Sequence, residues 1–229
     1  MHKTVYILGT GHCGSTLLGL ILGSHSQCEY IGEYSFMFDK YNKPENIARI
    51  RKHGYCSLCE NSCKYFDRQR THDELYEMFG KILIDNSKKN NFAKDTMNEH
   101  SKFIFIVRNP LDVIGSYKKS DEFSKKKIRH VIKKNNDILK FLEDKQHVIV
   151  KYCDLANQSI IKECCNYIGI PFENKMVKYW TKQHHGNYNP KILTRHKIEI
   201  VYNADLLERK EKKFAVKCGI KTISRKFGY

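Results

Sequence analysis

The chain has 229 residues, of which 41% are hydrophobic, enough for one domain with a full core and too many for a disordered chain. Lys and Arg outnumber Asp and Glu by 41 to 25, and the formal net charge of +16 favours polyanionic partners over polycationic ones. Nine cysteines, an odd number, with no segment typical of a secretory signal, argue against a disulfide framework. We therefore expect a reducing, cytoplasmic setting.

The first stretch of the chain consists of an apolar run, a glycine-rich loop and a second apolar run. The two runs predict a buried parallel strand at residues 4–8 and a helix at residues 15–22. A loop in this position points backbone N–H groups and a helix N-terminus at a phosphate. Its glycine spacing approaches a nucleotide P-loop, but the lysine before the Ser-Thr pair is missing, which disfavours ATP or GTP hydrolysis.

Two other interpretations of this stretch compete with phosphate binding. A glycine-rich turn can serve α/β packing alone. A run of about 20 residues without Lys, Arg, Asp or Glu could also span a membrane. However, interior glycines together with His12, Ser15 and Thr16 would be poorly satisfied in hydrocarbon, so we expect no membrane span.

A brief second strand is expected at residues 30–32, which places Glu33 at its carboxyl end. Ligands in open α/β sheets bind beyond the carboxyl ends of the strands. A carboxylate at this place can act as general base for a hydroxyl nucleophile. Glu33 can also be a surface carboxylate at the start of a helix, and its position alone favours this second role.

Residues 41–70 are interpreted as a cysteine-containing excursion from the core. Three cysteines, Cys56, Cys59 and Cys63, lie at spacings compatible with a tetrahedral zinc site, with His53 as a nearby fourth donor. A second Cys-x-x-Cys pair is absent. Free thiols and a local disulfide remain alternatives to structural zinc, and we expect no catalytic metal.

Two further strands are predicted in the middle of the chain. Thr71 and Glu74 form a capping-box pattern before a helix, and residues 81–85 then predict a strand followed by Lys88. Residues 103–107 predict another strand, followed by Arg108 and by a helix that starts at Pro110. An arginine at a strand end, with Ser116 on the following helix, could bind a second phosphate, or simply pair with its own helix.

The remaining chain continues the alternation of helices and strands. We expect a long basic helix at residues 123–142, a last parallel strand at 147–152 and an amphipathic helix at 157–168. A turn-rich cluster at residues 184–191 precedes a basic helical end. The whole sequence therefore predicts an α/β fold: a single P-loop-type domain over residues 1–229, with a central parallel sheet flanked by helices on both faces.

Taken together, these stretches resemble the sulfotransferases that use 3′-phosphoadenosine 5′-phosphosulfate (PAPS). Residues 9–18 look like the 5′-phosphosulfate loop of that family, and residues 107–116 look like its 3′-phosphate motif. Residues 150–155 are similar to its Tyr-Glu-Asp-Leu segment, and residues 85–88 to an Asp-Ser-Ser-Lys segment of its bacterial and carbohydrate-type branch. The matches occur in order over about four fifths of the chain.

The resemblance implies transfer of a sulfuryl group from PAPS to a hydroxyl or amine of a small-molecule or glycan acceptor, with adenosine 3′,5′-bisphosphate (PAP) as product. The catalytic residues implied are Glu33 as base, with His12 and Lys88 stabilising charge; His12, His184 and His185 are alternative bases. The implied donor-binding residues are Gly11, His12, Cys13, Gly14, Ser15, Thr16, Leu17, Arg108, Ser116 and Tyr152.

Three positions depart from the family pattern. His12 stands where many members have Lys or Arg, and Cys153 replaces the Glu of the Tyr-Glu-Asp-Leu segment. The His/Asn turn can be aligned through Asn187 or Asn189. The alternatives to a sulfotransferase are a P-loop nucleotide kinase, a form that binds donor without turnover, and a basic nucleic-acid-binding protein. No recognisable DNA- or RNA-binding motif is present, so we expect no specific nucleic-acid partner.

Overall fold

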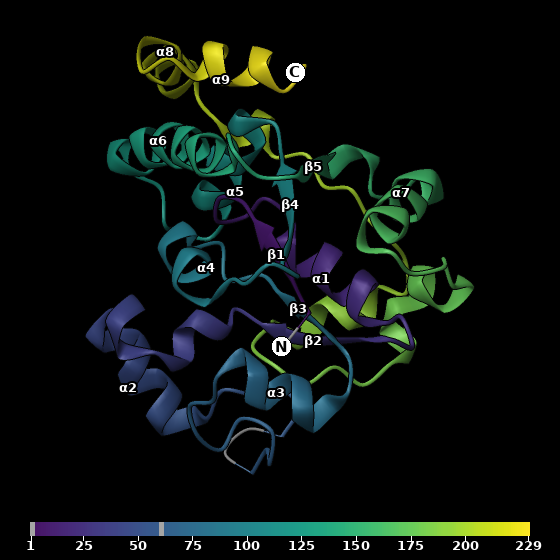
Figure 1. Ribbon diagram of the computed structural model, residues 1–229. Coiled ribbons are helices and arrows are strands. Elements are labelled where there is room, and N and C mark those ends of the chain that lie inside the picture. Colours follow the sequence, from purple (N-terminus) through teal and green to yellow (C-terminus); the bar gives the residue numbers. More distant parts are fainter. Residues whose placement is uncertain (1–2, 60–61) are drawn as a thin grey trace.

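Five parallel strands form one sheet in the order β2-β3-β1-β4-β5 in the computed structural model, which describes residues 3–59 and 62–229 (Figure 1). Central strand β1 pairs with β3 on one side and with β4 on the other. The strands are β1 Thr4–Leu8, β2 Cys28–Gly32, β3 Ile82–Asp85, β4 Lys102–Val107 and β5 His147–Lys151. The predicted parallel sheet is therefore confirmed, and β2 begins two residues earlier than expected.

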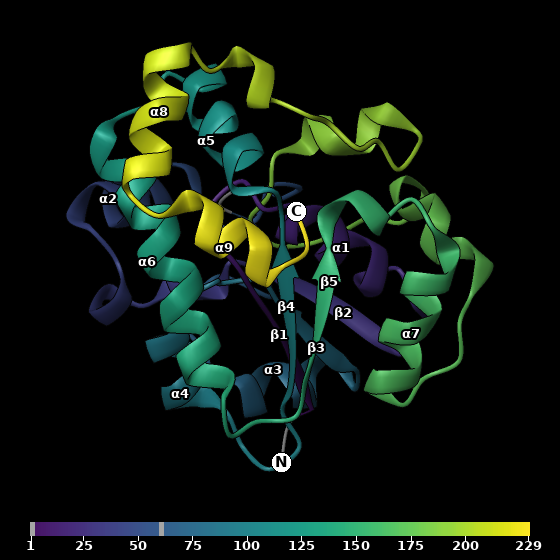
Figure 2. The same cartoon turned by 90° about the horizontal axis from the view of Figure 1, so that it is seen from above.

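Helices cover both faces of the sheet, as the sequence predicts (Figure 2). The helices are α1 Ser15–Gly23, α2 Pro44–His53, α3 His72–Phe79, α4 Asn90–Thr96, α5 Pro110–Lys119, α6 Lys125–Leu142, α7 Gln158–Ile168, α8 Arg209–Lys217 and α9 Ile220–Lys226. Short 3₁₀ segments are η1 Tyr34–Met37, η2 Asp39–Tyr41, η3 Tyr152–Asp154, η4 Asn174–Thr181, η5 Pro190–Arg195 and η6 Ala204–Leu206.

The alternation of side chains along β1 shows how the two faces are packed. Val5 and Ile7 belong to a buried cluster with residues of α1 and α7. Tyr6 and Leu8 point to the other face and join residues of α4, α6 and α9. Every residue of β1 is buried, including the polar Thr4, as expected for a parallel strand that is covered on both faces.

The order of the strands creates a switch point at β1. The chain runs from β1 through α1 to β2 on one side of the sheet, and after β3 it crosses to β4 and β5 on the other side. Loops that leave the carboxyl ends of β1 and β4 therefore diverge at this point and leave a crevice, the usual place of a ligand in such sheets.

Two local differences from the expected elements have simple causes. Residues 41–70 contain a helix that was not predicted, α2, with Pro44 in its first turn and Gly54 at its C-cap. The long basic helix begins at Lys125 rather than at residue 123, because the Ser124 side chain accepts from Lys127 N and acts as N-cap. The capping box at Thr71 is present as predicted.

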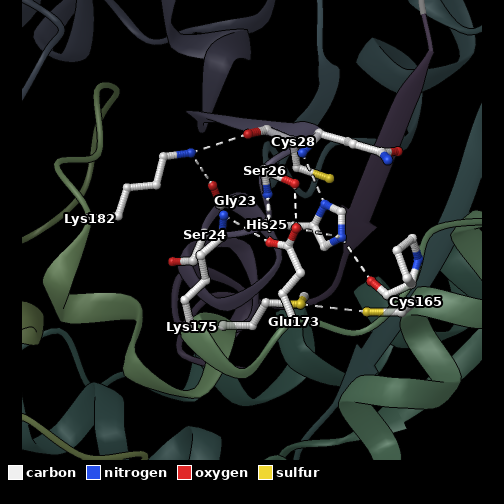
Figure 3. Close-up of polar contacts among 12 residues, drawn as sticks. Gly23, Ser24, His25, Ser26, Cys28, Cys165, Glu173, Lys175 and Lys182 are labelled. Carbon is white, nitrogen blue, oxygen red and sulfur yellow. Dashed lines mark hydrogen bonds and ion pairs between the residues drawn. The ribbon is translucent and has the colours of Figure 1, made fainter.

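The end of α1 is anchored to the C-terminal part of the chain (Figure 3). Lys182 Nζ donates to the carbonyl of Gly23 at 2.5 Å and to that of Cys28 at 3.2 Å. Glu173 accepts from the backbone N–H of Ser26 at 2.9 Å. The carbonyl of Gly23, the last residue of α1, lacks an intrahelical partner, so Lys182 satisfies it and at the same time ties the end of α1 to the start of β2.

No helix within residues 3–59 and 62–229 has the length and apolar character needed to cross a bilayer. In particular, the apolar run near the N-terminus is divided between β1 and α1.

Candidate functional site

The carboxyl ends of all five strands border one cavity of about 990 Å³. Each strand end supplies part of its lining: the glycine loop after β1, Glu33 after β2, Lys88 after β3, Arg108 after β4 and Tyr152 after β5. A volume of this size suits a nucleotide-sized ligand. The sequence motifs at the strand ends are thus brought together at one place.

The glycine loop presents backbone N–H groups to this cavity. Gly14 is the N-cap of α1 with φ 98° and, as a glycine, has no side chain with which to cap the helix, whose first residue is Ser15. The first N–H groups of a helix lack intrahelical partners and carry the positive end of its dipole, so they favour an anion. The loop residues in the cavity lining are Gly11, His12, Gly14, Ser15, Thr16 and Leu17. Cys13, the remaining predicted loop residue, is not among the lining residues, and its side chain is buried in the core.

Tyr152 joins the glycine loop to Arg108. A Cβ atom added at Gly14 would lie 2.3 Å from the Tyr152 ring, so only glycine fits there. The Arg108 guanidinium lies over the same ring, 4.5 Å from its centroid, in a cation–π contact. The two anion-binding stretches that the sequence predicts therefore both contact one aromatic ring.

Arg108 is almost fully buried and bonded mainly to carbonyl groups. Its Nη1 donates to the His12 carbonyl at 2.9 Å and its Nη2 donates to the Val201 carbonyl. Its Nε–H is buried without a partner among the described residues. The guanidinium thus has one unused N–H donor, and its other bonds go to neutral carbonyl oxygens. A phosphate could accept from the unused donor and take the place of these carbonyls, because its charged oxygens form stronger hydrogen bonds.

Residues 199–203, here called the C-terminal strap, cover this region. Tyr152 Oη accepts from Val201 N at 3.1 Å and donates to the Glu199 carbonyl at 3.3 Å. Asn203 N donates to Asp112 Oδ1 at 2.6 Å. Sequence reasoning missed this strap, since it carries no recognisable motif and its contacts lie about 50 to 90 residues back along the chain.

The strap also occupies Ser116. The Ser116 hydroxyl is 2.7 Å from the side-chain amide of Asn203 and does not line the cavity. The strap lies so close to α5 that a Cβ atom at Gly115 would come within 1.9 Å of the Asn203 carbonyl oxygen. Of the two predicted 3′-phosphate residues, Arg108 therefore lines the cavity and Ser116 lies beneath the strap.

Glu33 and Lys88 form an ion pair within the cavity lining. Lys88 Nζ contacts Glu33 Oε1, and both side chains are partly buried. The contact uses one of two carboxylate oxygens and one of three ammonium hydrogens, so each partner keeps capacity for a ligand.

Asp85, the last residue of β3, holds the loop that carries Lys88. Asp85 Oδ1 accepts from Ser87 N at 2.7 Å, and Asp85 Oδ2 lies 3.0 Å from His72 Nε2. Ser35 N donates to Ser87 Oγ at 2.9 Å, which joins this loop to the segment after Glu33. A buried hydrogen-bonded network of this kind holds the ion pair in place.

His12 lies at the rim of the cavity with φ 60° and its ring edge-on to Tyr117, at 4.5 Å between centroids. Desolvation lowers the pKa of His12 below its usual 6.5; Glu122 opposes this, and the cations Lys88 and Arg108 add to it. The imidazole is therefore neutral at pH 7 and offers one N–H donor rather than a positive charge.

The other histidines considered as bases do not face this cavity. His184 is fully buried, and its Nε2 lies 2.9 Å from the Tyr179 carbonyl. His185 points at three cysteines instead, within a group formed by Cys56, Cys59, Cys63 and His185 that could hold a metal ion. The prediction of His53 as the fourth donor is wrong. His53 is the last residue of α2, is exposed to solvent and lies outside this group.

The far side of the cavity is formed by two segments. Phe36, Asn46 and Arg49 come from η1 and α2. The second segment supplies residues 187–190, Ile192 and Arg195. Both Asn187 and Asn189 line the cavity, so the structure keeps both alignments of the His/Asn turn.

The family model described as "Sulfotransferase family" matches residues 4–174, about three quarters of the chain. The sulfotransferase domain from the Synechococcus PCC 7002 olefin synthase is 16% identical, with a TM-score of 0.64, over 97% of this chain and 95% of that one. The sulfotransferase domain from the curacin biosynthetic pathway is 17% identical, with a TM-score of 0.56, over 96% and 98%.

A third solved structure, sulfotransferase STF9 from Mycobacterium avium, is 9% identical, with a TM-score of 0.53, over 99% of this chain and 76% of that one. At such identities these structures show a shared fold. No match is found among curated protein sequences.

Proposed function

The chain belongs to the sulfotransferase family, whose members are PAPS-dependent enzymes, and we propose that it transfers the sulfuryl group of PAPS to a hydroxyl or amine of a small-molecule or glycan acceptor. One observation carries this proposal. Ser15 at the glycine loop and Arg108 at the end of β4 line the same cavity, with Tyr152 between them. One nucleotide with phosphate groups at both ends can therefore contact both.

In this proposal the glycine loop holds the 5′-phosphosulfate. Backbone N–H groups of residues 11–17, together with the Ser15 and Thr16 hydroxyls, donate to its oxygens. The Thr16 hydroxyl accepts from Asn86 Nδ2 at 3.4 Å, and Asn86 in turn accepts from the buried Tyr30 hydroxyl at 3.1 Å. This chain of side chains orients Thr16 before the donor arrives.

Arg108 is the proposed ligand of the 3′-phosphate. Its unpaired Nε–H and its two carbonyl contacts fit an anion better than they fit the neutral groups present. Tyr152, with its face against Arg108, fixes the plane of the guanidinium. Ser116 can join this site only if the Asn203 amide releases it, so we assign it a secondary role.

Glu33 and Lys88 are proposed to act at the point of transfer. Sulfuryl transfer is an in-line displacement in which negative charge moves onto the leaving phosphate. Lys88 can donate to the sulfuryl and bridging oxygens, and Glu33 can take the proton of the acceptor hydroxyl. The neutral His12 can add one hydrogen-bond donor, which is less than the cation that many relatives have at this place.

The acceptor is expected on the side formed by Phe36, Arg49 and residues 187–190. Phe36 and Tyr188 supply aromatic surface, and the Arg49 guanidinium lies 6.0 Å from the Phe36 ring centroid. An arginine beside an apolar ring favours an acceptor that carries an anionic group next to its hydroxyl. The excess of basic residues in the whole chain points in the same direction.

A ligand comparison tests the proposal. Thermal unfolding is measured with PAP, with ATP and Mg²⁺, and with GTP; a selective ligand at about 100 times its Kd adds about 2.7 kcal/mol to the free energy of unfolding. We expect stabilisation by PAP alone. Transfer is then measured by mass spectrometry with PAPS and a panel of hydroxylated acceptors. Equal stabilisation by ATP and Mg²⁺, or PAP binding without transfer to any acceptor class, would contradict the proposed reaction.

A further inference from the structure

We propose that Cys56, Cys59, Cys63 and His185 bind one zinc ion, and that this ion fixes residues 186–190, of which 187–190 line the cavity, against residues 56–59, here called the cysteine loop. The proposal is independent of the sulfuryl transfer proposed above. It rests on how four ligand atoms from two distant parts of the chain converge.

The convergence is centred on one ring nitrogen. His185 Nδ1 lies 3.5 Å from Cys56 Sγ, 3.4 Å from Cys59 Sγ and 3.4 Å from Cys63 Sγ. All four ligand atoms lie within 4.8 Å of one another. His185 is more than 120 residues away from each cysteine in sequence, so local chain geometry alone does not bring it there.

These distances match a tetrahedral zinc site. Zinc binds thiolate sulfur at about 2.3 Å and imidazole nitrogen at about 2.0–2.1 Å, and a tetrahedral angle then separates the two ligand atoms by about 3.6 Å. The three sulfur–nitrogen separations of 3.4–3.5 Å are therefore nearly those of a preformed site. The spacing from Cys56 to Cys59 to Cys63 also falls in the range of structural zinc ligands.

A disulfide explains the same residues less well. It would join two of three sulfurs at about 2.0 Å, leave the third cysteine over, and give no reason for the histidine to lie nearly equidistant from all three. All three cysteines are free thiols in the structure, and Cys56 and Cys63 are buried. Three sulfurs around one imidazole nitrogen form a set of soft and borderline ligands, which zinc prefers over Mg²⁺ or Ca²⁺.

The site is structural rather than catalytic. Four protein ligands leave no open position for water or substrate, and none of the four residues lines the cavity.

The contacts of Gly186, the residue after His185, show which segments the ion would hold together. Its carbonyl accepts from Ser57 N at 2.9 Å and from Ser57 Oγ at 2.6 Å, while a Cβ on Gly186 would lie 3.0 Å from the Ile31 carbonyl carbon.

The ion would therefore connect three parts of the protein. The cysteine loop lies on one side of Gly186, and the end of β2, just before Glu33, lies on the other. Asn187 N approaches Gly32 closely enough that a Cβ there would lie 2.6 Å away. Zinc at this place would keep residues 186–190 in contact with the strand end that carries Glu33.

Metal content is the first test. The full chain is expressed without added zinc and purified without chelator, and metals are counted by plasma mass spectrometry. We expect one zinc per chain. His185→Asn should lose at least about 10-fold in zinc affinity, whereas His53→Asn, the same change at the nearby histidine outside the cluster, should retain the ion. Cys59→Ser is compared with Cys218→Ser in the same way.

A second measurement does not depend on whether the variants fold. Zinc in the unmutated protein is exchanged for Co²⁺, and the absorption spectrum is recorded. Cobalt in a tetrahedral thiolate site gives intense ligand-field bands and a sulfur-to-metal charge-transfer band. Chelation should also increase amide hydrogen exchange in residues 55–59 and 184–190, with little change in β1 and β4.

Three results would overturn the proposal. The first is folded protein that contains no zinc and takes up no Co²⁺ with a charge-transfer band. The second is equal loss of metal from His185→Asn and His53→Asn, which would exclude this ligand set. The third is hydrogen exchange in residues 184–190 that does not respond to chelation, which would exclude the role in fixing the cavity wall.

Discussion

The ring of Tyr152 lies against Gly14 and also carries the Arg108 guanidinium 4.5 Å from its centroid, so the end of β5 contacts both the loop after β1 and the end of β4. Gly14 and Arg108 are 94 residues apart in the sequence, and this ring contacts both, beside the direct hydrogen bond from Arg108 Nη1 to the His12 carbonyl of the glycine loop.

Gly14→Ala should destabilise the protein and abolish PAP binding. An alanine at φ 98° costs about 1–2 kcal/mol, and its Cβ would additionally displace the Tyr152 ring. Gly80→Ala is a matched control, because Gly80 also has positive φ, and among the described residues nothing beyond its immediate chain surroundings lies within 4 Å of the added Cβ. It should show the backbone cost only. Chemical denaturation and calorimetry with PAP measure both effects, and equal PAP binding by the two variants would contradict the role given to Tyr152.

Arg108→Ala should weaken PAP binding by about 1.5–3 kcal/mol, or roughly 10- to 100-fold, the value of a charged hydrogen bond. Arg108→Lys should give an intermediate loss, since lysine keeps the charge but not the planar fork. The affinity for adenosine 5′-monophosphate, which lacks the 3′-phosphate, should change far less. Arg51→Ala, at an exposed ion pair with Asp39, should bind PAP normally. Equal losses for both nucleotides would remove Arg108 from the 3′-phosphate site.

Glu33→Gln should retain PAP affinity and lose about 10²–10⁴-fold in turnover, because the amide cannot accept the acceptor's proton. Single-turnover transfer from PAPS and calorimetry with PAP separate these two properties. Glu45→Gln, at an exposed ion pair on α2, should leave both unchanged. A Glu33→Gln enzyme with full activity would show that another group takes the proton.

The affinity for PAP should rise on acidification through His12. The pKa of His12 in the free protein is lowered, first by desolvation, so the imidazole is neutral at pH 7. A bound phosphate stabilises the imidazolium and raises this pKa, so binding takes up a proton and strengthens as pH falls through the pKa of the complex. The gain ends below the pKa of the free protein.

The measurement for His12 is a series of Kd values against pH for the unmutated protein and for His12→Asn. The phosphates of PAP titrate in the same range, and the variant corrects for their contribution because it retains them. Parallel pH profiles would falsify a charge contribution from His12. A steeper rise in the unmutated protein supports it.

The elements that were predicted correctly are those whose signals are local. The strand at residues 4–8, the loop and the helix from Ser15 form one continuous stretch, and Pro110 marks the start of α5 directly after Arg108. Because parallel strands present their carboxyl ends at one edge, these local signals were enough to place the glycine loop, Glu33, Lys88 and Arg108 around the same crevice.

The parts that were not predicted depend on contacts between distant residues. His185 meets the cysteines because η4 packs against α1 and the turn after it packs against the end of β2, whereas His53 is near the cysteines only in sequence. The C-terminal strap binds Arg108 through a backbone carbonyl and Ser116 through the Asn203 amide. No pattern of side chains in the sequence indicates contacts of this kind. For α2, the signals were present as Pro44 and Gly54, so that helix could have been found.

The cavity is lined by two portions of the chain, one inside the stretch that matches the sulfotransferase family and one beyond it. The match to the family ends at residue 174, and the glycine loop, Glu33, Lys88, Arg108 and Tyr152 all precede that point. Residues 187–195, which form part of the opposite wall, follow it. In the proposed function, changes at residues 187–195, which precede the strap that contacts Arg108, alter what enters beside Glu33 and leave the proposed nucleotide ligands in place, so acceptor choice can diverge while the donor stays the same.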